Sequence, residues 1–144
     1  MDLKIKILKE NAVKPEYATK GSAGMDLVAA TDGAVTLKSG GRALISTGIA
    51  MQIPQGYAGF IFPRSGLAHK KGISMSNCVG VIDSDYTGEI MVSLHNIADH
   101  DYIVNTGDRV AQMVIMPIAM ADIKIVEELD KTDRGDGGFG STGR

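Results

Sequence analysis

Short apolar runs, separated by glycines or prolines at regular intervals, are the feature that most constrains the fold of this chain. Many short strands with turn residues between them are typical of an antiparallel β-sandwich or barrel. No long window of the sequence has a convincing helical period, so an all-β domain is predicted. The clearest runs in the first half of the chain are Ala34 to Leu37, Ala43 to Thr47, Ile49 to Ile53 and Tyr57 to Phe62.

Further strands are predicted near both ends of the chain. At the N-terminus, Leu3, Ile5 and Ile7 stand at alternate positions, which indicates a half-buried strand. A later apolar run carries Arg109 and Gln112, two polar residues that each need a partner inside a strand. The predicted strands of the last third are Tyr102 to Val104, Arg109 to Met116 and, because of its isoleucines, the ambiguous stretch Ile118 to Leu129.

The segment from Pro63 to Gly72 interrupts the strand pattern. Ser65 is a good N-cap, Leu67 to Lys71 can form one or two helical turns, and Gly72 is a good stop. A helix N-terminus offers free N–H groups and a positive dipole end, so Arg64 beside it would complete a compact anion site. The alternative is an ordinary capped turn with Arg64 in solvent.

Size and charge exclude several classes of protein. The chain has 144 residues, which suits one domain with one core. A net charge of −2 argues against direct nucleic-acid binding, since such surfaces are normally basic. The one cysteine, Cys78, excludes an internal disulfide and is expected to be a buried, inert thiol in a reducing compartment. The chain has neither a membrane-spanning apolar stretch nor a signal-peptide core, so a cytoplasmic location without membrane contact is predicted.

The stretch from Asn77 to Ile90 reads as a hairpin. Its first run, Cys78 to Ile82, is too apolar to face water, and a second run begins at Ile90. Asp83 and Tyr86 lie between the two runs, so the polar end of the first strand is expected to open into a pocket. A polar turn without function is the alternative.

Asp26 and the C-terminal segment are further candidates for a site. Asp26 enters an apolar strand, where a carboxylate usually has a partner because an unpaired buried charge is costly. Arg109 could pair with an aspartate or contact a ligand. The segment 133–144, DRGDGGFGSTGR, has the composition of a flexible terminus. Its N–H groups, hydroxyls and arginines could also wrap a polyphosphate, with Phe139 covering a flat base.

Five segments in order resemble the five motifs of the trimeric dUTP pyrophosphatases, or dUTPases. They are AGMDLVA from Ala23, PRSGLA from Pro63, GVIDSDYTGEI from Gly80, GDRVAQ from Gly107 and RGDGGFGSTG from Arg134. The resemblance implies a β jelly roll, or distorted barrel, over residues 1–132 and a C-terminal lid over 133–144. It also implies a homotrimer with sites shared between subunits, and Mg²⁺-dependent hydrolysis of dUTP to dUMP and pyrophosphate. Such an enzyme lowers the dUTP available to DNA synthesis and supplies dUMP for dTMP.

The resemblance also assigns residue roles. Asp83 would be the catalytic base, and Tyr86 would pack on the deoxyribose and exclude a 2′-hydroxyl. Mg²⁺ would be held by phosphate oxygens and waters, with no direct protein ligand. Asn77, Gly80, Val81, Ile82 and Met91 would read uracil; Arg64, Ser65, Gly66 and Gln112 would hold phosphates; Arg134, Phe139, Gly140, Ser141 and Thr142 would close over the ligand; Asp26, Asp108 and Arg109 would support them.

Two alternatives remain at this point. A dCTP deaminase of the same superfamily would require a catalytic glutamate, and Glu89 is the only glutamate near the central motif. A regulatory protein that uses dUTP as a switch would belong to a different functional class.

Overall fold

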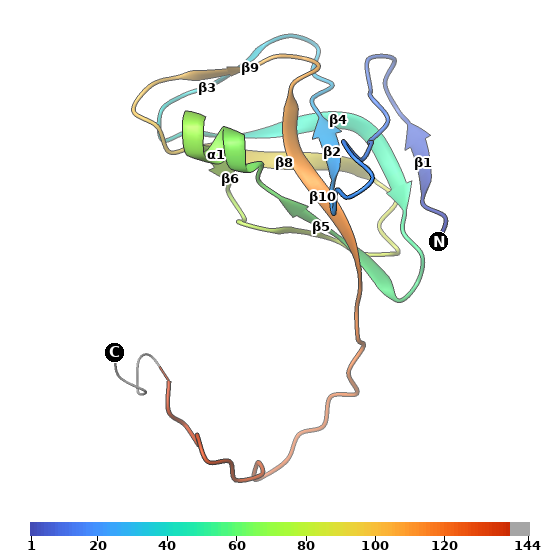
Figure 1. Cartoon of the computed structure of the whole chain (residues 1–144), viewed down its shortest axis with the longest axis vertical. Coiled ribbons are helices and arrows are strands. Elements are labelled where there is room, and N and C mark those ends of the chain that lie inside the picture. Colours follow the sequence, from blue (N-terminus) through green and yellow to red (C-terminus); the bar gives the residue numbers. More distant parts are fainter. Residues whose placement is uncertain (139–144) are drawn as a thin grey trace.

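Two facing four-stranded sheets form the body of the protein, as seen in a computed structural model that describes residues 1–138. The strand orders are β1-β4-β8-β6 and β2-β10-β5-β7, and a short ribbon, β3-β9, completes the body (Figure 1). The elements of the described chain are β1 (Lys4–Ile7), β2 (Met25–Val28), β3 (Val35–Leu37), β4 (Arg42–Gln52), β5 (Tyr57–Phe62), α1 (Ser65–Lys71), β6 (Ile73–Met75), β7 (Gly80–Ile82), β8 (Glu89–Asn96), β9 (Tyr102–Val104) and β10 (Arg109–Pro117).

Alternating side chains fill the space between the sheets. In β8 every second residue is buried, so that Ile90, Val92 and Leu94 face the core. They pack in one cluster with Leu27 and Met113 of the opposite sheet. Two antiparallel sheets packed in this way are the arrangement of a jelly roll, so the predicted all-β class with one short helix is confirmed.

Gly48 lies inside a strand and does not separate two strands as predicted. β4 runs through from Arg42 to Gln52, and its pairing with β8 is irregular between Ser46 and Ala50. Gly48 has a φ of +66°, a conformation that favours glycine. A glycine in a β-bulge and a glycine in a turn give the same local signal in a sequence, which explains the wrong prediction.

The predicted hairpin from 77 to 90 is wrong, because its two strands lie in different sheets. β7 pairs with β5, whereas β8 pairs with β4 and β6. The chain between Ile82 and Glu89 therefore crosses from one sheet to the other. The first run is not buried in the single chain, since Val81 is 58% exposed and Cys78 is exposed with a φ of +56°.

The helix prediction is confirmed with one correction. α1 covers Ser65 to Lys71 and ends at Gly72, which has the left-handed conformation expected of a C-cap. Arg64, not Ser65, is the N-cap residue. Basic residues fill the last turn, where the helix dipole favours positive charge. Nowhere in residues 1–138 is a helix long and apolar enough to cross a membrane.

Two expectations about the chain ends need correction. β1 forms as predicted, but Ile7 is 51% exposed in the single chain. Beyond Pro117 the chain leaves the body as an arm without strand or helix over the described part (Figure 1), so the strand predicted for Ile118 to Leu129 is wrong. Ile123 and Ile125 of this arm are 91% and 100% exposed.

Candidate active site

The first cleft of interest, the arginine cleft, lies beside the N-terminus of α1 and has a volume of about 810 Å³. Arg64 and Arg109 both line this cleft, and both pair with Asp26 of β2. The Arg64 Nε atom lies 3.0 Å from Asp26 Oδ1, and an Arg109 guanidinium nitrogen lies 3.2 Å from Oδ2. The expected partner of Asp26 is thus found, and the carboxylate fixes two guanidinium groups at the cleft wall.

Gln112 and Asp108 complete this cleft through backbone contacts. The Gln112 side-chain amide donates to the Pro63 carbonyl at 3.1 Å, which ties β10 to the chain just before α1. Asp108 Oδ2 accepts a hydrogen bond from the Asn105 N–H at 2.8 Å and closes the turn before β10. Burial, together with the Asp108 charge, raises the pKa of the Tyr102 hydroxyl in the same cleft. Ser65 and Gly66 line the cleft as well.

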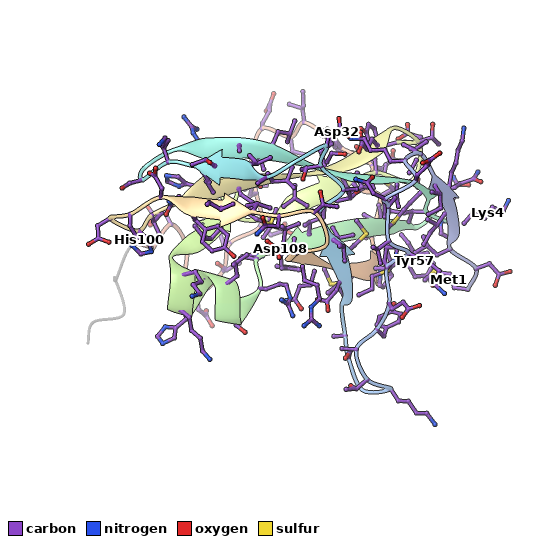
Figure 2. All side chains as sticks on the ribbon, turned by 90° about the horizontal axis from the view of Figure 1, so that it is seen from above. Met1, Lys4, Asp32, Tyr57, His100 and Asp108 are labelled. Carbon is purple, nitrogen blue, oxygen red and sulfur yellow. The ribbon has the colours of Figure 1, made fainter. Side chains whose placement is uncertain are left out.

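A second cleft, the Asp83 cleft, has a volume of about 770 Å³ and lies where β7 ends. Asp83 and Asp85 line it together with Lys4 at the N-terminal end of the chain. The two clefts share no lining residue within residues 1–138. Figure 2 shows Lys4 near one end of the sandwich and well apart from Asp108, which lines the arginine cleft.

Tyr86 lies in the crossing between the sheets, folded back onto the chain that follows it. Its hydroxyl donates to the Glu89 carbonyl at 2.9 Å. A Cβ atom on Gly88 would lie 2.6 Å from the Tyr86 hydroxyl oxygen, so only glycine leaves room for the ring there. Tyr86 remains 45% exposed, so part of the residue is accessible to a ligand.

Glu89 is held by hydrogen bonds at the start of β8. Its Oε1 accepts from the Ser46 hydroxyl and, at 2.8 Å, from the Gly48 N–H. Burial raises the pKa of this carboxyl, but the two hydrogen bonds and the nearby Lys9 outweigh burial and hold the pKa below its ordinary value. Glu89 is therefore an ionised carboxylate engaged in structural contacts.

The structure brings together only part of the predicted site. Arg64, Ser65, Gly66, Gln112, Asp26, Asp108 and Arg109 meet in one cleft, whereas Asp83 lies in the other. Arg134 lies on the exposed arm, where its Nε donates to the Gly137 carbonyl at 2.8 Å. Among the predicted uracil-reading residues, Gly80 is buried against Ile61, and Asn77 and Val81 are exposed. Four predicted residues, Phe139, Gly140, Ser141 and Thr142, lie outside the described residues.

The clefts also contain residues that the sequence interpretation did not single out. Lys71 and Tyr102 line the arginine cleft, and Gln52 and Gln55 line the Asp83 cleft. Lys71 ends the predicted helix, at the opposite end from Arg64, so no local signal in the sequence indicated that it lines this cleft. The two glutamines gave no signal, because their position depends on the packing of the turn between β4 and β5.

Residues 1–138 contain no group of three or more His, Cys, Asp or Glu side chains placed to hold a metal ion. Asp26, one of the two carboxylates that line the arginine cleft, already pairs with an arginine through each of its oxygens.

Comparison with known proteins identifies the family. The family model described as dUTPase matches residues 10–143. The chain belongs to the dUTPase family. A deoxyuridine 5'-triphosphate nucleotidohydrolase from Idiomarina loihiensis is 55% identical over 131 residues, which cover 90% of this chain and 87% of that protein.

Solved dUTPases have the same fold as this family member. The dUTPase of Staphylococcus bacteriophage 80alpha, solved with dUpNHpp, aligns with a TM-score of 0.87 at 30% identity and covers 99% of each chain. A mutant dUTPase from phage phi11 of S. aureus, described with a structural Mg(II) ion, aligns with a TM-score of 0.81 at 31% identity, covering 89% of this chain and 98% of that one.

Proposed function

We propose that this protein hydrolyses dUTP to dUMP and pyrophosphate. The observation that carries the proposal is family membership over residues 10–143, with five dUTPase-like motifs in order along the chain. The likeness to a dUTPase solved with the dUTP analogue dUpNHpp supports a uracil nucleotide as substrate.

Asp83 is the proposed catalytic base. It lies at the end of β7, exposed in a cleft, and so can reach both water and ligand. Its carboxylate accepts a proton from a water molecule as the water oxygen attacks the α-phosphorus. The bond from that phosphorus to the bridging oxygen breaks, and pyrophosphate leaves with the bonding electrons. A positioned general base contributes about 10²–10⁴-fold to such a reaction.

The arginine cleft is the proposed binding site for the phosphates. Arg64 is preorganised by Asp26, and a fixed guanidinium stabilises developing phosphoryl charge without reorganising during the reaction. The N–H groups at Ser65 and Gly66 and the Gln112 amide offer further donors. Lys71 adds a cation to the wall of the same cleft.

Substrate selection is assigned to the segment around β7. Backbone groups of Gly80, Val81 and Ile82, with Asn77 and Met91, read the uracil edge, because backbone donors and acceptors have fixed directions. Tyr86 packs on the deoxyribose and excludes the 2′-hydroxyl of UTP. The segment 133–144 closes over the bound nucleotide, with Arg134 and the hydroxyls of Ser141 and Thr142 near the phosphates and Phe139 on the base.

A homotrimer with shared sites is part of the proposal. The catalytic aspartate and the phosphate-binding arginine line different clefts of one chain, so a second copy would have to bring them together. The single chain also leaves apolar side chains exposed, among them Val81 and Ile125. Such surfaces typically mark contacts with another chain.

Mg²⁺ is proposed to enter with the triphosphate. The arginine cleft offers cations, and its Asp26 carboxylate is already paired with two arginines. Phosphate oxygens and waters are the proposed ligands for the metal. The metal neutralises phosphate charge when bound. In this scheme the protein's own residues orient the substrate and the attacking water.

A dCTP deaminase activity is disfavoured by the state of Glu89. A deaminating glutamate must exchange protons with its substrate, whereas the Glu89 carboxylate accepts hydrogen bonds from Ser46 and Gly48. A dUTP-gated regulatory role is compatible with hydrolysis and is tested by pull-down with and without dUpNHpp.

Pyrophosphate and ammonia release test the proposed function. The protein is incubated separately with the four common dNTPs, dUTP and UTP. Pyrophosphate from dUTP alone is expected. Ammonia from dCTP, or equal hydrolysis of dUTP and dTTP, would overturn the proposal.

A further inference from the structure

Glu89 connects the crossing that carries Asp83 and Tyr86 to the irregular part of β4. One carboxylate oxygen, Oε1, accepts both the Ser46 hydroxyl and the Gly48 N–H. Ser46 is the last β4 residue in regular pairing before the register shifts, and Gly48 lies inside the irregular stretch between Ser46 and Ala50. The carboxylate thus fills the gap that the shift leaves in the ladder.

The irregular part of β4 is itself firmly held by other segments. The Gly48 carbonyl accepts from the Leu8 N–H at 2.7 Å, and the Ser46 carbonyl accepts from the Ala30 N–H at 2.8 Å. A Cβ atom on Gly48 would lie 2.8 Å from the Ala12 Cβ atom, so the packing around it is tight. Glu89 is therefore anchored to a rigid point.

The other side of Glu89 contacts the tyrosine. The Glu89 carbonyl is the acceptor for the Tyr86 hydroxyl at 2.9 Å, and the ring lies over Gly88. Movement of the Glu89 backbone would remove this acceptor and shift the ring. The distance between Tyr86 and a bound sugar would change with it.

We propose that Glu89 is a positioning residue for sugar selection. Its carboxylate, bound to Ser46 and Gly48, fixes the backbone carbonyl that holds Tyr86 at the place where a 2′-hydroxyl would clash. This inference rests on the proposed function and adds to it a residue that sets specificity without touching the substrate. If the role of Glu89 were purely structural, its replacement would lower the stability of the protein. The activities on dUTP and UTP would then fall by the same factor, and their ratio would be unchanged.

The ratio of kcat/KM for dUTP to kcat/KM for UTP tests this role. Glu89→Ala removes the acceptor of two hydrogen bonds and is expected to lower the ratio by about tenfold or more, since hydrogen bonds to charged groups are among the stronger ones. Glu89→Gln retains a carbonyl oxygen in the same place and is expected to keep most of the discrimination.

Thr47→Val is the matched structural control. The Thr47 hydroxyl donates to the Ile90 carbonyl, so this hydrogen bond also joins β4 to β8. Thr47 is next to Gly48 in the sequence and Ile90 is next to Glu89, so Thr47→Val weakens the same pair of strands without touching the Glu89 carboxylate. It is expected to lower the melting temperature without changing the substrate ratio. If Glu89→Ala does not fold, Ser46→Ala removes one of the same hydrogen bonds and is expected to lower the ratio several-fold.

The outcomes separate this inference from the proposed function. Wild-type protein that releases no pyrophosphate from dUTP would remove both. Active wild-type protein whose ratio is unchanged by Glu89→Ala, or by Ser46→Ala where Glu89→Ala does not fold, would overturn the inference alone. The inference would also be overturned if Thr47→Val changed the ratio of kcat/KM values as much as the test variant does.

Discussion

Replacement of Gly48 by alanine is expected to destabilise the protein through two separable effects. Gly48 has a φ of +66°, and an L-residue in this left-handed region costs about 1–2 kcal/mol. The new Cβ atom would also lie 2.8 Å from Ala12 Cβ, 3.0 Å from Lys9 Cβ and 3.1 Å from Ala30 Cβ. Overpacking of this kind costs about 1–3 kcal/mol. Gly48→Ala should therefore cost about 2–5 kcal/mol.

Two other glycines separate strain from packing. Gly40 has a φ of +69° but nothing within 4 Å of its Cβ position, so Gly40→Ala should cost only the strain. Gly33 has open space and no left-handed φ, so Gly33→Ala should be close to neutral. The three variants form a series in which one term is removed at each step.

Thermal unfolding gives the melting temperatures of the three variants. All are measured at one fixed protein concentration, because assembly would make the melting temperature depend on concentration. At about 3–5 °C per kcal/mol for a chain of this size, the packing cost of about 1–3 kcal/mol should make Gly48→Ala melt at least ~3 °C below Gly40→Ala. Equal melting temperatures for these two variants would refute the packing described around Gly48, and with it the rigid anchor inferred for Glu89.

Four further predictions concern the site. Asp83→Asn should still bind dUpNHpp while losing about 10²-fold or more in turnover, and retained turnover would exclude Asp83 as the base. Asp26→Asn should raise the KM for dUTP by about tenfold, because Arg64 loses the carboxylate that orients it; an unchanged KM in steady-state assays would show that this ion pair does not act on substrate. Deletion of 133–144 should abolish turnover but leave the melting temperature of the body nearly unchanged, because the last strand ends at Pro117. A fully active deletion variant would contradict the lid. Glu89→Gln should be less stable than wild type at pH 7, and this difference should shrink as pH falls through the folded-state pKa of Glu89, which lies below its ordinary value of 4.5. A stability difference independent of pH would contradict the ionised state of Glu89.

The fold class could be predicted from the sequence because it depends on local signals. Strands between glycines and prolines, the short helix after Arg64 and the C-cap at Gly72 are all set by the chemistry of neighbouring residues. Partner choice between strands is not local. The hairpin predicted for 77–90 failed because β7 and β8 each find a partner elsewhere in the chain.

The site could be predicted only in part for the same reason. A carboxylate within an apolar strand indicated that Asp26 needs a partner, and the structure supplies Arg64 and Arg109. No spacing in the sequence could show that Asp83 lies in a different cleft from these arginines. The exposure of Cys78 and Val81 was also missed, because the apolarity of a run does not say whether the same chain buries it.

Isotope labelling tests the central claim most directly, which is that water attacks the α-phosphorus of dUTP. Hydrolysis in ¹⁸O-enriched water, with mass spectrometry of both products, reports which phosphorus the water oxygen joins. Label in dUMP and none in pyrophosphate is the predicted result. Label in pyrophosphate, or no hydrolysis of dUTP, would contradict the account.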